Sequence, residues 1–159
     1  MKKKFYTPEM AYAKLQQYCV YQERCHQEVR YKLIELGIFG SALEEIIARL
    51  IEENFLNEER FAKAFAGGKF RIKQWGRIKI KLELKQRNIS NYCVQEALKE
   101  ITDKDCLETI KSIIQKKSNL EQNTLNDPKF KNNVYQLLAR KGFENQLIME
   151  VMNLFDQEL

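Results

Sequence analysis

The residues best suited to chemistry in this sequence lie in one stretch, KFRIKQWGRIKIKLELKQR, from Lys69 to Arg87. Eight of its nineteen residues are Lys or Arg and only Glu83 is acidic, so the stretch carries a net charge of +7. The whole chain of 159 residues carries only +5. Because charges of one sign repel each other, such a cluster indicates an anionic partner. We expect nucleic-acid phosphates, an acidic protein groove, or both.

The candidate binding residues are the cations of this stretch and its tryptophan. Contacts from Lys and Arg to phosphates give salt-dependent affinity without reading base sequence. Trp75 lies beside Gly76, and it could stack on a base, anchor a protein contact or pack in the core at a turn. The predicted site consists of Lys69, Arg71, Lys73, Trp75, Arg77, Lys79, Lys81, Lys85 and Arg87.

No catalytic or metal-binding arrangement competes with this prediction. His26 is the only histidine, and it follows Cys25 directly, so the two side chains would point apart on a helix. The sequence has no phosphate-binding glycine loop and no paired carboxylates spaced to hold a metal. Its four cysteines form no CxxC pair and are expected to be buried free thiols. We therefore expect no enzyme, no cofactor and no metal.

The composition favours a mostly helical protein of the cytoplasm. Only two Pro and six Gly occur, and the commonest residues favour helix on balance. The positive start, MKKKFYTPEM, has no apolar run behind it and so does not read as an export signal. No stretch approaches the 18 apolar residues of a membrane span. No membrane partner is expected, and nothing marks a dimer interface, which favours a monomer.

A repeat appears when the chain is aligned with itself. The phrases VRYKLIELGI, IKLELKQRNI and VYQLLARKGF end at Ile38, Ile89 and Phe143, which are 51 and 54 residues apart. Apolar residues recur at the same offsets before and after these three anchors, at spacings typical of helices. The residues just before the anchors, Gly37, Asn88 and Gly142, tolerate the left-handed conformation that ends a helix. Repeats of this length indicate an array of small helical units.

The predicted fold is all-α, with three tandem three-helix repeats at 5–56, 57–102 and 103–159. Each repeat would open with a helix, at 10–20, 57 to about 73 and 103 to about 117, and the basic stretch falls in the middle repeat. The polar run 116–127 is expected to be a loop or a frayed helix end. Because each unit is too small to bury its apolar face alone, we expect an elongated, curved array with a continuous core.

Several helix starts can be predicted from capping residues. Thr7-Pro8 and Asp127-Pro128 each place an N-cap before a proline in the first turn. Ser41-Ala-Leu-Glu44 has the spacing of a capping box. Ser90 or Asn91, and Asn145, are weaker N-cap candidates for the remaining helices.

The segment from Arg77 to Lys85 alternates charged and apolar residues, a pattern that on its own favours a strand. The repeat predicts a helix instead, with Ile80 and Leu84 as its core pair. Ile78 and Leu82 would then lie on the opposite side. We expect that second face to pack within the chain, and a contact with a partner is the alternative.

The middle of the chain resembles the RecX family of regulatory proteins. The resemblance rests on FLNEERFAKAF from Phe55 to Phe65 and on the basic stretch that follows. The positions that correspond to the family motif are Glu58, Arg60, Phe61, Ala62, Arg71, Gly76, Ile80, Leu84, Asn88 and Ile89. The sequence departs from the family pattern at Asn57, at Asn88 and at Gly67-Gly68. The two glycines predict that the helix over 57–73 bends or ends early.

This resemblance implies a modulator of RecA, the recombinase that forms filaments on single-stranded DNA. It implies a helical body that lies in the filament groove and damps ATP hydrolysis, strand exchange and co-protease activity, and thereby a role in recombination, DNA repair and the SOS response. From the charge pattern we expect the basic residues to make the contact, and Arg60, Phe61, Ile80 and Leu84 to hold the fold. A stand-alone DNA-binding protein and a protein-interaction adaptor remain as alternatives.

Overall fold

The computed structural model describes residues 4–157 and is entirely helical over that range. Nine α-helices and one π-helical turn follow each other between residues 4 and 157. They are α1 (Pro8–Tyr21), α2 (His26–Glu35), α3 (Gly40–Glu52), α4 (Glu58–Gly68), η1 (Lys69–Lys73), α5 (Arg77–Gln86), α6 (Asn91–Leu98), α7 (Asp103–Glu121), α8 (Pro128–Arg140) and α9 (Asn145–Gln157). The all-α fold class is therefore confirmed.

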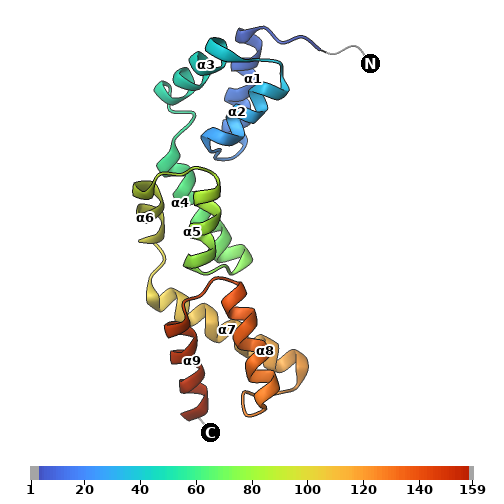
Figure 1. Ribbon diagram of the computed structural model, residues 1–159, viewed down its shortest axis with the longest axis vertical. Coiled ribbons are helices and arrows are strands. Elements are labelled where there is room, and N and C mark those ends of the chain that lie inside the picture. The colour runs from blue at the N-terminus through green and yellow to red at the C-terminus, as the bar shows by residue number, and fades with distance from the viewer. Residues whose placement is uncertain (1–3, 158–159) are drawn as a thin grey trace.

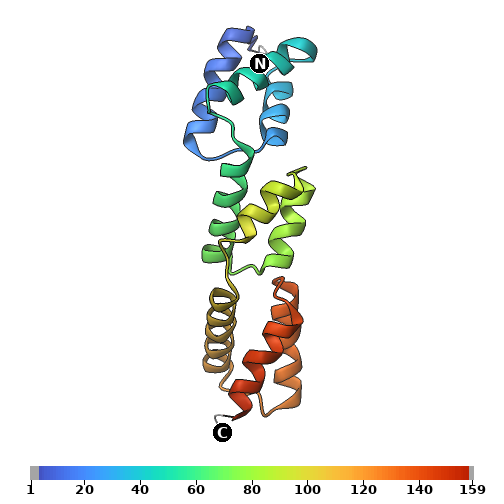
Figure 2. The same cartoon turned by 90° about the vertical axis from the view of Figure 1, so that its left-hand side faces the viewer.

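The helices form three groups that lie end to end (Figures 1 and 2). We call α1–α3 unit 1, α4–α6 with η1 unit 2, and α7–α9 unit 3. Helices pack against each other mainly inside a unit. The molecule is consequently elongated, with its two ends at opposite poles and unit 2 in the middle.

Most of the predicted helix starts are confirmed. The side chain of Thr7 accepts a hydrogen bond from the Met10 amide at 3.2 Å, and that of Asp127 accepts one from the Lys129 amide at 3.0 Å. Ser90 caps α6 through the Cys93 amide. Each of these bonds satisfies a backbone donor that the first helical turn leaves free.

Two predicted caps are wrong. Helix α3 already begins at Gly40, after Phe39, so Ser41 lies inside the first turn and caps nothing. Asn145 is the first residue of α9, and its side-chain oxygen accepts a hydrogen bond from the Tyr135 hydroxyl at 2.6 Å. In both places the helix starts at or before the residue that the sequence pattern put forward as its cap.

The three repeat turns have the predicted conformation. Gly37, Asn88 and Gly142 have φ angles of 83°, 59° and 94°, all in the left-handed region. The expectation for 116–127 was only partly right, because α7 continues to Glu121 before Gln122 turns left-handed and ends it.

The glycine pair at Gly67-Gly68 marks a change in the helix, as expected. Helix α4 ends at Gly68, and the next five residues form the π-helical turn η1. Gln74, with a φ of 55°, then ends the turn. Wider π-helical turns occur often at functional sites, and this one carries three of the predicted binding residues.

The alternating segment is an α-helix, and its core pair is confirmed. Ile80 and Leu84 of α5 are fully buried. Ile78 and Leu82 lie on the other side of the helix and are 47% and 57% exposed. The expectation that this second face packs within the chain is therefore wrong, because no helix among the described residues covers it.

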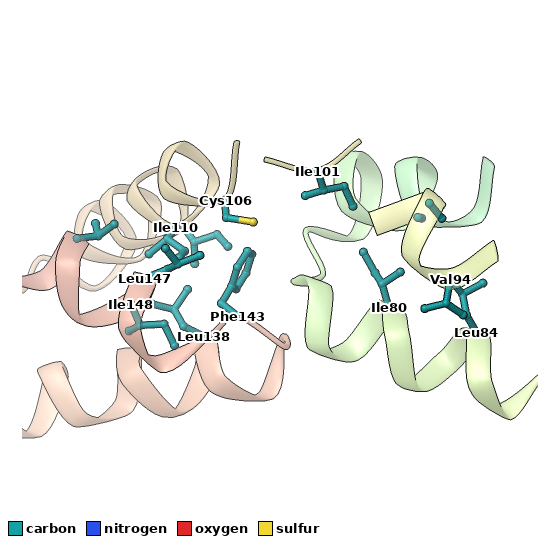
Figure 3. Packing of buried hydrophobic residues seen from close by; sticks show 14 of the residues in the cluster. Ile80, Leu84, Val94, Ile101, Cys106, Ile110, Leu138, Phe143, Leu147 and Ile148 are labelled. Carbon is teal, nitrogen blue, oxygen red and sulfur yellow. The ribbon is translucent and has the colours of Figure 1, made fainter. Parts of the chain in front are cut away.

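The core is divided into two clusters. One belongs to unit 1 alone, and the other runs through units 2 and 3 and includes Cys25 as its single member from unit 1. Figure 3 shows Ile101 of unit 2 on the side that faces Cys106 and Phe143 of unit 3. The prediction of a continuous core thus holds between units 2 and 3 but is wrong between units 1 and 2.

Arg60 bridges the boundary between units 1 and 2. Its Nε donates to Glu23 at 2.5 Å, and its other nitrogens donate to the side chain and carbonyl of Asn54 and to the carbonyl of Phe55. Phe61, beside it in the motif, is buried. Arg60 and Phe61 therefore hold the fold, as the sequence analysis expected.

Candidate functional site

Units 2 and 3 meet where α8 ends and α5 begins. Helix α5 has no side-chain cap at its start. Instead the Gly76 amide donates to the Lys141 carbonyl at 2.7 Å, and the Ile78 amide donates to the Gly142 carbonyl at 3.0 Å. Free amides at one helix start and free carbonyls at another helix end thus satisfy each other.

Two glycines make this contact possible. A Cβ added to Gly76 would lie 2.4 Å from the Gly142 carbonyl carbon, and a Cβ added to Gly142 would lie 2.4 Å from the Cβ of Lys79. Neither backbone could come so close with a larger residue. The junction therefore fixes the end of α8, and Lys141 with it, against the start of α5.

Trp75 lies at this junction with two lysines on its ring. The ring is half-buried against the core shared by units 2 and 3, and it meets Phe65 edge-on at a centroid distance of 6.4 Å. The ammonium groups of Lys79 and Lys69 lie 4.4 Å and 5.1 Å from the ring centroid. These are distances at which cations are attracted to the face of an indole ring.

Lys141 brings a further positive charge to the junction of units 2 and 3. Its Nζ donates to the Lys73 carbonyl at 3.2 Å. Burial lowers the pKa of Lys141, and the positive charge of Lys79 lowers it further. We call Trp75, Lys69, Lys79 and Lys141 the Trp75 cluster.

Lys141 was not among the binding residues predicted from the sequence. The residue lies in unit 3, far along the chain from the basic stretch, and the repeat only showed that it precedes a helix-ending glycine. Nothing in the sequence indicates that the end of α8 meets the start of α5. Only the three-dimensional arrangement brings Lys141 to the site.

Two of the predicted binding residues are engaged inside the protein. Arg77 bridges units 2 and 3, since it pairs with Asp103 at 2.5 Å and Glu144 at 3.0 Å and also donates to the Ile101 carbonyl. Arg87 pairs with Glu83 at 2.9 Å, and its guanidinium lies 4.7 Å from the centre of the Phe65 ring. Both side chains have acidic partners and contribute to packing.

The other six predicted cations form no ion pair with any acidic residue in the part of the chain whose side chains are described, 4–156. They are Lys69, Arg71, Lys73, Lys79, Lys81 and Lys85. Unit 2 therefore keeps a positive surface that its own acidic residues do not neutralise. Such a surface attracts anionic partners from solution.

Four of the six unpaired cations form two groups, and Arg71 and Lys73 lie in η1. Lys69 and Lys79 belong to the Trp75 cluster. Lys81 and Lys85 accompany the exposed Ile78 and Leu82, and we call these four residues the α5 stripe. A cleft of about 370 Å³ adjoins the stripe and is lined by Arg77, Ile78, Lys81, Gln95, Leu98, Lys99 and Glu144.

The described residues contain neither a candidate metal site nor a membrane-spanning helix. No three His, Cys, Asp or Glu side chains between residues 4 and 156 lie close enough together to hold a metal ion. Over the same part of the chain, no helix has both the length and the apolar character needed to cross a bilayer.

The fold and the site define an elongated protein of three-helix units with a basic middle unit. Comparison with known families gives the particular family. Residues 57–98 match the model of the RecX second three-helix domain, and residues 103–152 match that of the RecX third three-helix domain. The chain belongs to the RecX family.

Individual relatives agree with this assignment. The chain is 28% identical over 141 residues to the regulatory protein RecX of Lactobacillus johnsonii, a match that covers 89% of the chain and 52% of the relative. It is 27% identical over 132 residues to the regulatory protein RecX of Prosthecochloris aestuarii, covering 83% and 84%. The chain thus spans about half the length of the first relative and most of the second.

A solved structure has the same fold. The crystal structure of RecX from Lactobacillus salivarius superposes with a TM-score of 0.82 at 26% sequence identity. The superposition covers 94% of this chain and 97% of that one. The order and packing of the helices are therefore similar over nearly the whole chain.

Proposed function

We propose that this chain binds the filament that RecA forms on single-stranded DNA, and that it inhibits or modulates the filament's ATP hydrolysis, strand exchange and co-protease activity. In this proposal it acts by binding and catalyses no reaction itself. Membership of the RecX family supports this function. The single structural observation that supports it best is the set of six unpaired cations on unit 2.

The elongated shape also suits this function. A filament offers a long groove lined by protein and by DNA phosphates, and a narrow row of units can follow such a groove. Cations in the middle unit would meet phosphates without reading base sequence. We assign the contact to Lys69, Arg71, Lys73, Lys79, Lys81 and Lys85, with Trp75 at its centre, and assign Arg77 and Arg87 to internal packing.

The test is a titration of RecA's ATP hydrolysis on single-stranded DNA with this protein. We expect inhibition at less than one molecule per RecA subunit. A variant with Lys79, Lys81 and Lys85 changed to Glu should need about ten-fold more protein for the same inhibition, because it repels phosphates. Unchanged hydrolysis at saturating wild-type protein would contradict the function.

A matched control keeps the charge change and moves it to unit 3. Lys104, Lys111 and Lys116 of α7 are exposed and form no ion pair with the described acidic residues. Reversing these three charges should leave inhibition within about two-fold of wild type. If both triple variants lose inhibition equally, net charge and not the unit 2 surface is responsible.

The alternatives predict different behaviour in the same setting. A stand-alone DNA-binding regulator would bind a particular duplex sequence and leave RecA unaffected. An adaptor without a DNA contact would not bind bare single strands in a salt-dependent way.

A further inference from the structure

We propose that Lys69 and Lys79, which lie beside the Trp75 ring, and Lys141, which is bonded to the Lys73 carbonyl across the junction of units 2 and 3, form a composite site for a backbone phosphate of single-stranded nucleic acid. The inference deepens the proposed function, on which it rests for the presence of DNA. It adds that the site is shared between two units and that one of its ligands lies outside the basic stretch.

The three lysines come from separate segments and meet at the junction of units 2 and 3. Lys79 and Lys69 hold their ammonium groups within 4.4 Å and 5.1 Å of the Trp75 ring centroid. The Lys141 Nζ lies 3.2 Å from the carbonyl of Lys73, two residues before Trp75, and the positive charge of Lys79 adds to the lowering of the Lys141 pKa. None of the three cations pairs with an acidic residue between 4 and 156, so their charges repel each other, and a bound phosphate relieves that repulsion.

Contacts within the protein already hold Lys141 and Lys79 in place. The Lys141 backbone is held by the Gly76 amide, and its side chain is held by the Lys73 carbonyl. Lys79 is held from behind by the Gly142 backbone, which leaves no room for a Cβ. A site whose ligands are already in place loses less entropy on binding than one made of free lysines.

Trp75 indicates which kind of anion the lysines bind. The half-buried Trp75 places an aromatic ring directly beside the ammonium groups of Lys69 and Lys79, which a site for a protein carboxylate does not require. In a single strand each phosphate is followed by an unpaired base, and aromatic side chains beside a basic groove are the usual combination for binding it. The cluster therefore fits a nucleotide strand better than an acidic peptide.

The protein contains its own reporter for this site. Trp75 is the only tryptophan in the chain, so its fluorescence reports on the cluster without a label. We would titrate the full chain with oligothymidylate in the absence of RecA. We expect a saturable change in Trp75 emission, weakened by salt.

The decisive variant is Lys141→Gln. We expect about ten-fold weaker binding, and a slope of log affinity against log salt that is shallower by about 0.7, the value for one lost phosphate contact on a single strand. The matched control is Lys116→Gln, which removes the same charge from an exposed position in the same unit. It should bind within about two-fold of wild type. Equal binding by wild type and Lys141→Gln, or equal losses in both variants, would overturn the proposal.

A second ligand separates phosphate binding from binding to bases. An abasic deoxyribose-phosphate oligomer of the same length should still bind, and its binding should still depend on Lys141. Failure of that oligomer to bind would overturn the assignment of the cluster to phosphate.

The two proposals fail in different ways. If Lys141→Gln lowers DNA affinity while RecA hydrolysis is unaffected by the wild-type protein, only the proposed function is lost. If RecA is inhibited but the affinity for oligothymidylate does not depend on Lys141, only the composite-site proposal is contradicted.

Discussion

At the scale of the residue, the cations of the basic stretch divide into those with acidic partners and those without. The eight basic residues of the stretch look alike in the sequence. Arg77 differs from the rest because Asp103 and Glu144, both in unit 3, pair with it, and these contacts depend on how two units meet. The sequence therefore shows which residues are basic but not which of them have acidic partners in another unit.

The cysteines give a prediction at this scale. Cys19, Cys25 and Cys106 are buried free thiols, and burial raises the pKa of each to about 11 from 9.0. At a given pH below 9 each thiolate should be about a hundred-fold scarcer than in the unfolded chain. A disulfide reagent should accordingly react slowly with the native protein and rapidly in denaturant.

The same pKa shifts determine the effect of pH. Because the thiols ionise earlier in the unfolded chain, their contribution to stability is complete below pH 9 and is lost as the pH rises from 9 toward about 11. Denaturation midpoints measured across this range should fall.

For the reactivity prediction, rapid modification of all native thiols by the disulfide reagent would contradict their burial.

At the scale of the element, the repeat gave reliable information about helices and turns. Its offsets predicted the core pair Ile80 and Leu84 and the left-handed turns, because both follow from local spacing. The capping-box pattern was wrong at Ser41, because α3 starts earlier than that pattern suggested. The repeat failed for the exposed pair Ile78 and Leu82, since whether a helix covers a face depends on packing that no local pattern contains.

The repeat turns provide a matched pair of substitutions. Gly142→Ala should destabilise the protein by about 3 kcal/mol or more, because the new Cβ is strained at a φ of 94° and also collides with the Lys79 backbone. Gly37→Ala, with a φ of 83° and open space around it, should cost only about 1–2 kcal/mol. Urea denaturation of the two variants measures the difference, and equal losses would mean that the junction does not constrain α8.

At the scale of the whole molecule, the two junctions are built differently. Units 2 and 3 share a core and exchange backbone hydrogen bonds, whereas units 1 and 2 are joined chiefly by polar contacts of Arg60 and by Cys25. The repeat predicted equivalent units but contained no information about this asymmetry. It arises because hydrophobic burial continues across one boundary and stops at the other.

The asymmetry predicts two cooperative units in hydrogen exchange. Amides of unit 1 should exchange through one opening reaction, and those of units 2 and 3 through a second that includes Gly76 and Ile78. Arg60→Ala should lower the free energy of unit 1 opening by about 1–3 kcal/mol, because Glu23 and two carbonyls lose a charged donor. Exchange of the whole chain in a single step would contradict this division.

The control for that variant is Arg49→Ala. Arg49 pairs with Glu53 and Glu9 on the exposed surface of unit 1 and does not reach unit 2. Its removal should change the opening free energy by less than about 1 kcal/mol.

The backbone bonds between units 2 and 3 also affect the order in which the chain can fold. Helix α5 begins at Arg77, but the carbonyls that accept its first amides belong to Lys141 and Gly142. During synthesis the ribosome releases the basic helix well before the residues that complete its start. The Trp75 cluster therefore does not exist in a nascent chain until unit 3 has emerged and docked, so the composite site can form only on a protein whose third unit has folded.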